Sequence, residues 1–418
     1  MDCVKCRGRV NSPFSCGREF CPVYTRSEAM FKSVDMIRKE EFQGTSPTVF
    51  VGQYGYPKVN VGIISSSEQN SDASLFDAPH YWAINSFTIK KVVELRSSLI
   101  NSRFKSDVGS SSKNLGYAQD IAMSSKPVDV DIKLFEKPKL KISFSNITLP
   151  MGPSAFLKGV NLASNPKAPN KVEKVVSDTD LKSVQAMSSL HSAGFNENDI
   201  SKILSVGVLG VKRSRRLVPT RWSITATDDT LAKLLIKRIK SYSTADYQLY
   251  HGSLYGNYYF VMFFPEVWGY ELFEGYLPMS LWNKSNEIGF VADYELYTGR
   301  KGYAESTAGG YYAARLPIVE KLDSLRRQAS VLVLRFITDE YSCPLGVFVC
   351  REAVRRALSS RPTNFSSKME LLNHAKKLVK SLFNYDIDSV LGQSVLLKGM
   401  KNQTKLSFFS ESPEPNTY

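Results

Sequence analysis

Four of the six cysteines, Cys3, Cys6, Cys16 and Cys21, are clustered at spacings that could hold a metal ion. Two residues separate the first pair and four separate the second, so two short turns can bring four thiolates around one tetrahedral ion. Gly8, Gly17 and Pro22 supply the sharp turns that such loops need. The cluster predicts a structural Zn²⁺ site in a reducing compartment, with an iron–sulfur cluster or four unrelated thiols as the alternatives.

The strongest concentration of positive charge lies in residues 211–240, which hold nine basic and two acidic side chains. Arginine forks bind phosphates, and a neighbouring aromatic ring can stack on an exposed base. The segment predicts nucleic-acid contacts from Lys212, Arg213, Arg215, Arg216, Arg221 and Trp222. Two alternatives stay open. The segment could be a solvated loop with Trp222 in the core, and the ligand could be RNA instead of DNA, since phosphate contacts do not report the sugar.

A second candidate phosphate site lies in residues 300–316 (RKGYAESTAGGYYAARL). Arg300 and Lys301 precede the pair Gly309–Gly310, which predicts a turn followed by a helix. Backbone N–H groups freed by such a turn, with Arg315 behind them, would hold a phosphate. A plain turn explains the same residues.

Acidic residues dominate positions 260–299, where Lys284 alone offsets six carboxylates. Carboxylates that collect divalent cations let nucleases activate water and neutralise a leaving phosphate. Such a two-metal site would use Glu271, Glu274, Asp293 and Glu295. The competing interpretation is salt bridges to the basic segment. Covalent hydrolysis and nucleotide hydrolysis lack support, because no G-x-S-x-G setting and no Walker-type loop is present.

The segment after residue 399 contains Gln403, Leu406, Phe408 and Phe409 and lacks the patterning needed to pack. It resembles the peptide by which replication and repair proteins bind the sliding clamp PCNA, in which glutamine enters a polar pocket and a helical turn aims apolar side chains into another. The spacing of three between Gln403, Leu406 and Phe409 matches that turn. The usual peptide has adjacent aromatics at its seventh and eighth positions, whereas here they stand at the sixth and seventh. A loosely docked tail is the alternative.

The composition of the whole chain is that of a folded protein with a polyanionic partner. Hydrophobic residues make up 43% and charged residues 22%, and 54 Lys and Arg against 40 Asp and Glu give a net charge of +14. No run of about 18 apolar residues and no signal-peptide pattern is present. We therefore expect a cytoplasmic protein with no membrane partner.

With 418 residues the chain has material for two or three domains. We expect an α+β fold, that is, a mixed α/β body, with an appended zinc module and a flexible tail. The expected boundaries are 1–26 for the zinc module, 27–398 for the body, with two subdomains meeting near 161–205, and 399–418 for the tail.

Periodicity and punctuation predict the elements of the body. Strands are expected at 48–51, 59–64, 255–264, 331–338 and 345–350. Helices are expected at 89–99, from a cap at Thr227 or Asp228 to Ile239, from near Arg351, and across 371–382. Loops are expected at 106–127 and 161–171, which are rich in Ser or punctuated by Pro. Cys343 and Cys350 lie in an apolar stretch and are expected in the core.

Several sequence blocks together resemble the archaeal Nre family of DNA repair proteins. They are the four-cysteine module, SPTVFVGQYGYPKVNVG, RRLVPTRWSITATDDT, GRKGYAESTAGGYYAARL, PLGVFVCREAVRRAL and the C-terminal peptide. The resemblance covers nearly the whole chain. It implies DNA damage repair and clamp binding, with the four cysteines as the zinc site and Gln403, Leu406, Phe408 and Phe409 as the clamp peptide, and it implies no particular reaction.

The expected function is therefore that of a DNA-binding repair factor recruited to PCNA. Two alternatives remain: a metal-dependent nuclease or related phosphoryl-processing enzyme, and a clamp-associated scaffold that binds no DNA.

Overall fold

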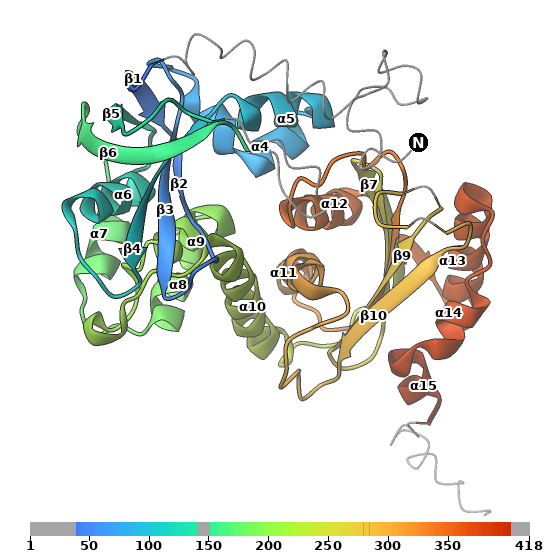
Figure 1. Cartoon of the computed structure of the whole chain (residues 1–418). Helices are drawn as coiled ribbons and strands as arrows, with labels where there is room; N and C mark the ends of the chain where they lie inside the picture. Colours follow the sequence, from blue (N-terminus) through green and yellow to red (C-terminus); the bar gives the residue numbers. More distant parts are fainter. Residues whose placement is uncertain (1–38, 140–150, 279, 284, 403–418) are drawn as a thin grey trace, which may run out of the picture.

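The computed structural model describes residues 39–139, 151–278, 280–283 and 285–402. These residues form two six-stranded sheets with helices packed on them (Figure 1). The expected mixed α and β body is confirmed.

The first sheet has the strand order β1-β5-β6-β4-β3-β2. Its strands are β1 (Glu41–Ser46), β2 (Thr48–Val51), β3 (Lys58–Ser65), β4 (Ile100–Asp107), β5 (Val128–Leu134) and β6 (Ser154–Leu162). All neighbouring pairs except β4 and β6 are antiparallel. In β4 and β5 every second residue is buried, which is the pattern of a sheet covered on one face.

The described part of the first half also contains α-helices and two short 3-10 helices, labelled η. They are η2 (Ala73–Asp77), α4 (Pro79–Ile84), α5 (Ile89–Ser97), α6 (Lys113–Met123), α7 (Asn170–Ser177), α8 (Ser183–Ser192), α9 (Glu197–Ser205), η3 (Lys212–Ser214) and α10 (Thr220–Ile239). Leu115, Ala118 and Ile121 of α6 enter the same buried core as Val61 and Ile63 of β3.

The second sheet has the order β10-β9-β11-β8-β7-β12 and is mixed, since β11 runs parallel to β9 and antiparallel to β8. Its strands are β7 (Tyr247–Leu254), β8 (Asn257–Phe264), β9 (Gly269–Tyr276), β10 (Gly289–Glu295), β11 (Ser330–Ile337) and β12 (Thr363–Phe365). All eight residues of β11 are buried, because this central strand is covered on both faces.

Helices cover both faces of the second sheet, and Figure 1 shows α13 and α14 on the opposite side of β9 and β10 from α11 and α12. These helices are α11 (Ala308–Leu325), α12 (Phe348–Ser359), α13 (Lys368–Phe383), α14 (Asp388–Gln393) and α15 (Val395–Asn402). Val331 and Val333 of β11 belong to the core with α11 and α12, whereas Leu332 and Leu334 belong to the core with α13. The second half is therefore a three-layer arrangement.

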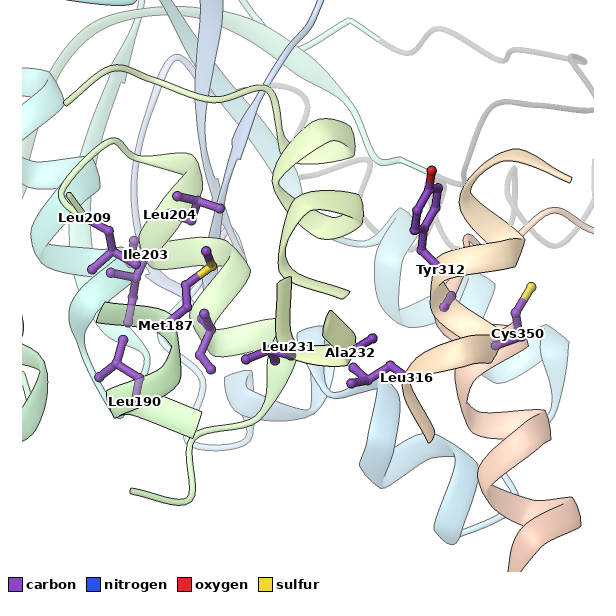
Figure 2. Close-up of a cluster of buried hydrophobic side chains, with 14 of the residues drawn as sticks. Met187, Leu190, Ile203, Leu204, Leu209, Leu231, Ala232, Tyr312, Leu316 and Cys350 are labelled. Carbon is purple, nitrogen blue, oxygen red and sulfur yellow. The ribbon is translucent and has the colours of Figure 1, made fainter. Parts of the chain in front are cut away.

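Helix α10 connects the two halves. Leu231 and Ala232 in its middle share one buried cluster with Met187 of α8 on one side and Leu316 of α11 on the other (Figure 2). A second connection comes from the first half, because Trp82 of α4 packs with Phe348 of α12 at a ring-centroid distance of 5.8 Å.

Most elements expected from the sequence are present. The strands expected at 48–51, 59–64, 255–264 and 331–338 are β2, β3, β8 and β11, and the helices expected at 89–99 and 371–382 are α5 and α13, with shifts of a few residues at their ends. Cys343 and Cys350 are 1% and 4% exposed, which confirms that they are core residues.

Three expectations were wrong. Residues 106–127 are not a loop throughout, because α6 occupies 113–123 with Ser112 capping it by accepting a bond from the N–H of Leu115. The apolar run 345–350 is not a strand: its last three residues begin α12, and a short apolar run does not distinguish a strand from a helix. The third concerns α10, which begins at Thr220 and not at Thr227 or Asp228.

No helix within the described ranges is long and apolar enough to cross a membrane.

Candidate nucleic-acid interface

The predicted basic segment between α9 and α10 is hydrogen-bonded to two distant parts of the first half. The N–H of Leu217 donates to the carbonyl of Val108 at 2.8 Å, and the N–H of Val108 donates to the carbonyl of Pro57 at 3.0 Å. The N–H of Val51, at the end of β2, donates to Oγ1 of Thr220 at 2.9 Å. These bonds hold the segment beside the β2–β3 turn and the loop after β4. We call the surface formed by residues 52–58, 107–109 and 211–222 the hairpin surface.

The hairpin surface is strongly positive. It carries one carboxylate, that of Asp107, and six basic side chains: Lys58, Lys212, Arg213, Arg215, Arg216 and Arg221. All of the six except Arg215 are exposed. Within the part of the chain that the structure describes, none of the six forms an ion pair with a carboxylate. Their charge is therefore available to a polyanion.

Two of these arginines shape the segment. Nε of Arg215 donates to the carbonyl of Gly210 at 2.7 Å, and its Nη2 donates to the carbonyl of Asp178 at 2.9 Å. Nη1 of Arg216 donates to the carbonyl of Arg215 at 2.8 Å. Bonds to neutral carbonyls do not neutralise either charge, although the carboxylate of Asp178 attracts that of Arg215. The bonds make Arg215 a positioning residue. Lys212, Arg213 and Arg221 are the side chains that project without such bonds.

Three large aromatic side chains are exposed on the same surface. Trp222 is 47%, Tyr56 is 50% and Tyr54 is 83% exposed. The ring centroids of Tyr56 and Trp222 lie 5.3 Å apart, with an interplanar angle of 47°. Trp222 is therefore not a core residue.

Sequence reasoning missed both tyrosines, because it took their segment only as strands and turn punctuation. The signal was present in the order Tyr-Gly-Tyr. Gly55 has φ of 83°, so it makes the tight turn that presents the two flanking rings.

The second candidate phosphate site is not formed as expected. Gly309 and Gly310 lie inside the first turn of α11, and a Cβ on Gly310 would stand 2.6 Å from a carboxylate oxygen of Glu274. A carboxylate at that point repels phosphate. Arg315 is 1% exposed and paired with Glu295 at 2.6 Å, so it does not face solvent. Arg300 is largely covered and Lys301 is exposed.

The four carboxylates proposed to share a metal do not come together. The β9–β10 register pairs Asp293 with Leu272, and alternation then puts Glu271 on the other face of the sheet. On that face Glu271 accepts bonds from the backbone N–H groups of Val395 and Leu396, at 3.0 and 3.1 Å. It therefore caps the start of α15.

The other three carboxylates pair with arginines: Glu274 with Arg335, Asp293 with Arg300 and Glu295 with Arg315. Over the described ranges, no group of three or more His, Cys, Asp or Glu is placed to hold a metal ion. The arrangement fits the salt-bridge interpretation, although the arginine partners come from β11, α11 and the loop before it, and not from residues 212–221.

A further group of charged side chains, which sequence reasoning did not anticipate, lies where α9, α10, α11 and α12 meet. Nη2 of Arg351 donates to both carboxylate oxygens of Asp228, and Nη1 lies 3.2 Å from Glu197. Arg355, one turn further, bonds the carboxylate of Glu197 at 3.0 Å through each of two nitrogens. We call this group, with Glu320 and Glu352 as further partners of Arg355, the buried arginine cluster.

The buried arginine cluster joins the two halves of the chain. Nδ1 of His80 in α4 lies 2.9 Å from a carboxylate oxygen of Glu352 in α12. Burial opposes ionisation of Glu197, but Arg351 and Arg355 outweigh burial and lower the pKa of Glu197 to about 2. The carboxyl group of Glu197 is therefore held ionised, and the ion pairs of the cluster connect the two halves.

Two sites expected from the sequence lie outside the described residues. They are the cysteines Cys3, Cys6, Cys16 and Cys21 and the tail residues Gln403, Leu406, Phe408 and Phe409.

Two known protein families together match nearly the whole chain. The family described as "Archaeal Nre, N-terminal" matches residues 15–283, and "Archaeal Nre, C-terminal" matches residues 295–409. The first match includes Cys16 and Cys21, and the second extends through Phe409.

Curated relatives match over most of their length. A protein named DNA repair protein NreB, from Archaeoglobus fulgidus, is 35% identical over 98% of this chain and 100% of its own. Two proteins named DNA repair protein NreA are also similar. The one from A. fulgidus is 38% identical over 91% of this chain and 94% of its own, and the one from Haloferax volcanii is 39% identical over 76% and 77%. No solved structure matches.

Proposed function

The chain belongs to the archaeal Nre family of DNA repair proteins, and from that membership we propose that it acts in repair by binding DNA through the hairpin surface. The relatives are named for repair, which makes DNA the polyanion to consider first. The observation that carries the proposal is the group of exposed basic side chains on this surface that have no carboxylate partner in the described part of the chain.

The contacts on the surface suggest which residues would bind phosphate and which would hold the segment in shape. Lys212, Arg213 and Arg221 would contact phosphates directly, because their charged ends are exposed. Arg215 would hold the segment in shape through its bonds to two carbonyls. The nuclease alternative gains no support, since the four carboxylates are held by separate protein partners.

The test is the salt dependence of DNA binding. Changing Lys212, Arg213 and Arg221 together to Gln should weaken binding and lower the slope of log K against log salt by about 2 to 3, because fewer counterions are released. A variant with the same net charge supplies the control: Arg361→Gln, Lys377→Gln and Lys380→Gln, three exposed sites in and before α13, on the other half of the molecule (Figure 1). Equal slopes for both variants would refute the assignment to this surface.

We also propose that the tail tethers the protein to PCNA. The peptide starts directly after the last residue of α15, Asn402, and the family match continues through it to Phe409. A tether raises the local concentration of the DNA-binding surface at replicating or damaged sites.

Calorimetric titration of PCNA into the intact protein tests the tether. Binding is expected, and it should be lost when Leu406, Phe408 and Phe409 are changed to Ala, since these side chains would fill the apolar pocket. Changing Glu411 and Glu414 to Gln keeps the apolar residues and should leave binding intact. Absence of binding by the intact protein would refute the tether and leave the DNA proposal untouched.

The third part of the proposal is a structural zinc ion held by Cys3, Cys6, Cys16 and Cys21. Four thiolates make a complete tetrahedral donor set and leave no open position for a substrate.

A further inference from the structure

Three exposed aromatic side chains gather on the hairpin surface. Tyr54, Tyr56 and Trp222 are all at least 47% exposed, and they gather at one place. The interior tryptophans Trp82 and Trp268 are at most 1% exposed, and each donates its indole N–H to a protein oxygen. Clustered exposed aromatics indicate a partner that covers them.

The backbone that carries the rings is held by hydrogen bonds in the free protein. The N–H of Lys58 donates to the carbonyl of Gly55 at 2.8 Å and closes the turn between the two tyrosines and β3. A Cβ on Gly55 would lie 2.8 Å from the carbonyl oxygen of Lys58, so the turn is tight. On the other side, the N–H of Trp222 donates to the carbonyl of Pro219 at 2.8 Å in the first turn of α10. These bonds order the backbone that carries the rings, and Tyr56 and Trp222 also contact each other through their rings. The backbone therefore does not have to be ordered again on binding.

The surroundings of the rings define the chemistry of the partner. Arg221 precedes Trp222, and Lys58 follows the tyrosine turn; both are exposed and lack an ion-pair partner among the described residues. A matching ligand must offer negative charge and flat apolar faces at the same time. Unpaired nucleotides do so, whereas the bases of an intact duplex stack on each other and present only their edges.

We propose that Tyr54, Tyr56 and Trp222 stack on unpaired bases, so that the hairpin surface prefers single-stranded DNA, or the single-stranded part of a repair intermediate, to intact duplex. This inference rests on the proposed DNA binding and adds the substrate class. The arginines supply affinity for either form through phosphates, and the rings supply the preference.

The test compares labelled oligothymidine of about 12 nucleotides with a blunt duplex of equal length, by fluorescence anisotropy, in the full chain. Tyr56→Ala and Trp222→Leu should each weaken single-strand binding by about 5- to 150-fold, the loss expected per stacked base, and should leave duplex binding unchanged. The salt slope should stay constant, since no charge is removed. Tyr81→Ala removes another exposed ring, on α4, and should have no effect.

Intrinsic fluorescence at saturating oligothymidine gives a second readout, which reports the surroundings of Trp222 and not the affinity. Trp222 is the most exposed of the four tryptophans, so stacking should quench the emission of the wild-type protein when oligothymidine is added. Trp222→Phe should bind oligothymidine nearly as well, because phenylalanine still stacks, and should lose the quenching. Tyr54 is 83% exposed, so Tyr54→Ala should weaken the binding of oligothymidine without disturbing the fold.

The outcomes separate the two proposals. If no DNA of either form binds, both fail. If DNA binds with the expected salt slope but the ring variants bind oligothymidine like wild type, the stacking inference fails and the DNA-binding proposal stands. Equal losses on duplex and single strand also overturn stacking, and tighter binding of oligouridine than of oligothymidine overturns DNA as the substrate.

Discussion

Arg351 of α12 donates two hydrogen bonds, of 2.9 and 2.8 Å, to the two carboxylate oxygens of Asp228 in α10, and neither side chain is more than 1% exposed. Asp228 belongs to the helix that connects the two halves, and Arg351 belongs to the helix that covers the second sheet. Glu197 of α9 approaches the same guanidinium at 3.2 Å. The interface between the halves therefore combines buried ion pairs with apolar packing.

Arg351→Met should lower the free energy of unfolding by about 3 to 5 kcal/mol, because it leaves Asp228 buried without its partner. Arg356→Met, at an exposed position of the same helix, should change it by less than about 0.5 kcal/mol. The double change Asp228→Leu with Arg351→Met should recover much of the loss, since no unpaired aspartate remains buried. Urea unfolding followed by circular dichroism measures all three, and equal stability of the Arg351→Met and Arg356→Met variants would contradict the expectation.

The same pair explains why sequence reasoning misplaced the start of α10. Asp and Thr are good helix caps, so Thr227 and Asp228 looked like a boundary. Both residues are in fact fully buried within the helix. Only the long-range partner Arg351, far along the chain, makes a buried aspartate acceptable there, and no local pattern reports such a partner.

Glu197 should make the free energy of unfolding depend on pH in the acidic range. Its pKa in the folded protein is about 2, below the ordinary value of 4.5. Above pH 4.5 the ionised acid contributes its full stabilisation, about 3 kcal/mol from the size of the shift. Below pH 4.5 the unfolded chain takes up the proton first, so the contribution shrinks and is lost as the pH falls toward 2. The difference in unfolding free energy between wild type and Glu197→Gln should thus be constant from pH 6 to 8 and narrow between about pH 4.5 and 2.

The measurement is urea unfolding at a series of pH values for wild type and Glu197→Gln. Glu173→Gln, on the exposed side of α7, shows how much any single glutamate contributes to the trend. A wild-type advantage that stayed the same down to pH 3 would show that the arginines do not hold Glu197 ionised.

Two helical glycines should respond to alanine with opposite signs. A Cβ on Gly310 of α11 would stand 2.6 Å from the carboxylate of Glu274, which is buried and paired with Arg335. Gly310→Ala should therefore cost about 1 to 3 kcal/mol of unfolding free energy. A Cβ on Gly116 of α6 meets no atom within 4 Å, so Gly116→Ala should add about 0.5 to 1 kcal/mol through helix propensity. Thermal unfolding of the two variants checks the signs, and a stabilised Gly310→Ala would contradict the packing.

Gly310 also shows what the sequence could and could not predict about the site. The glycine pair looked like a turn, because adjacent glycines commonly mark turns. Here the lack of a side chain serves close packing of α11 on the buried pair of Glu274 and Arg335. By contrast, the exposure of the basic segment was predictable, since a run of charged arginines is not buried without partners. The order Tyr-Gly-Tyr indicates a turn that exposes two rings, but its place beside the basic segment was not predictable, because that place depends on long-range hydrogen bonds.

The purified protein should contain zinc in a one-to-one ratio with the chain, because four thiolates complete the coordination of one ion. Cys16→Ser and Cys21→Ser should each abolish stoichiometric zinc, since three thiolates leave the site open and weaken it. Cys343→Ala changes a core cysteine and should keep the metal. Atomic emission measures the zinc and iron content, and a thiol-blocking reagent should release the zinc to a coloured chelator. Iron with inorganic sulfide in place of zinc would identify a cluster, and loss of metal from Cys343→Ala as readily as from Cys16→Ser would show that the proposed four cysteines are not the ligands.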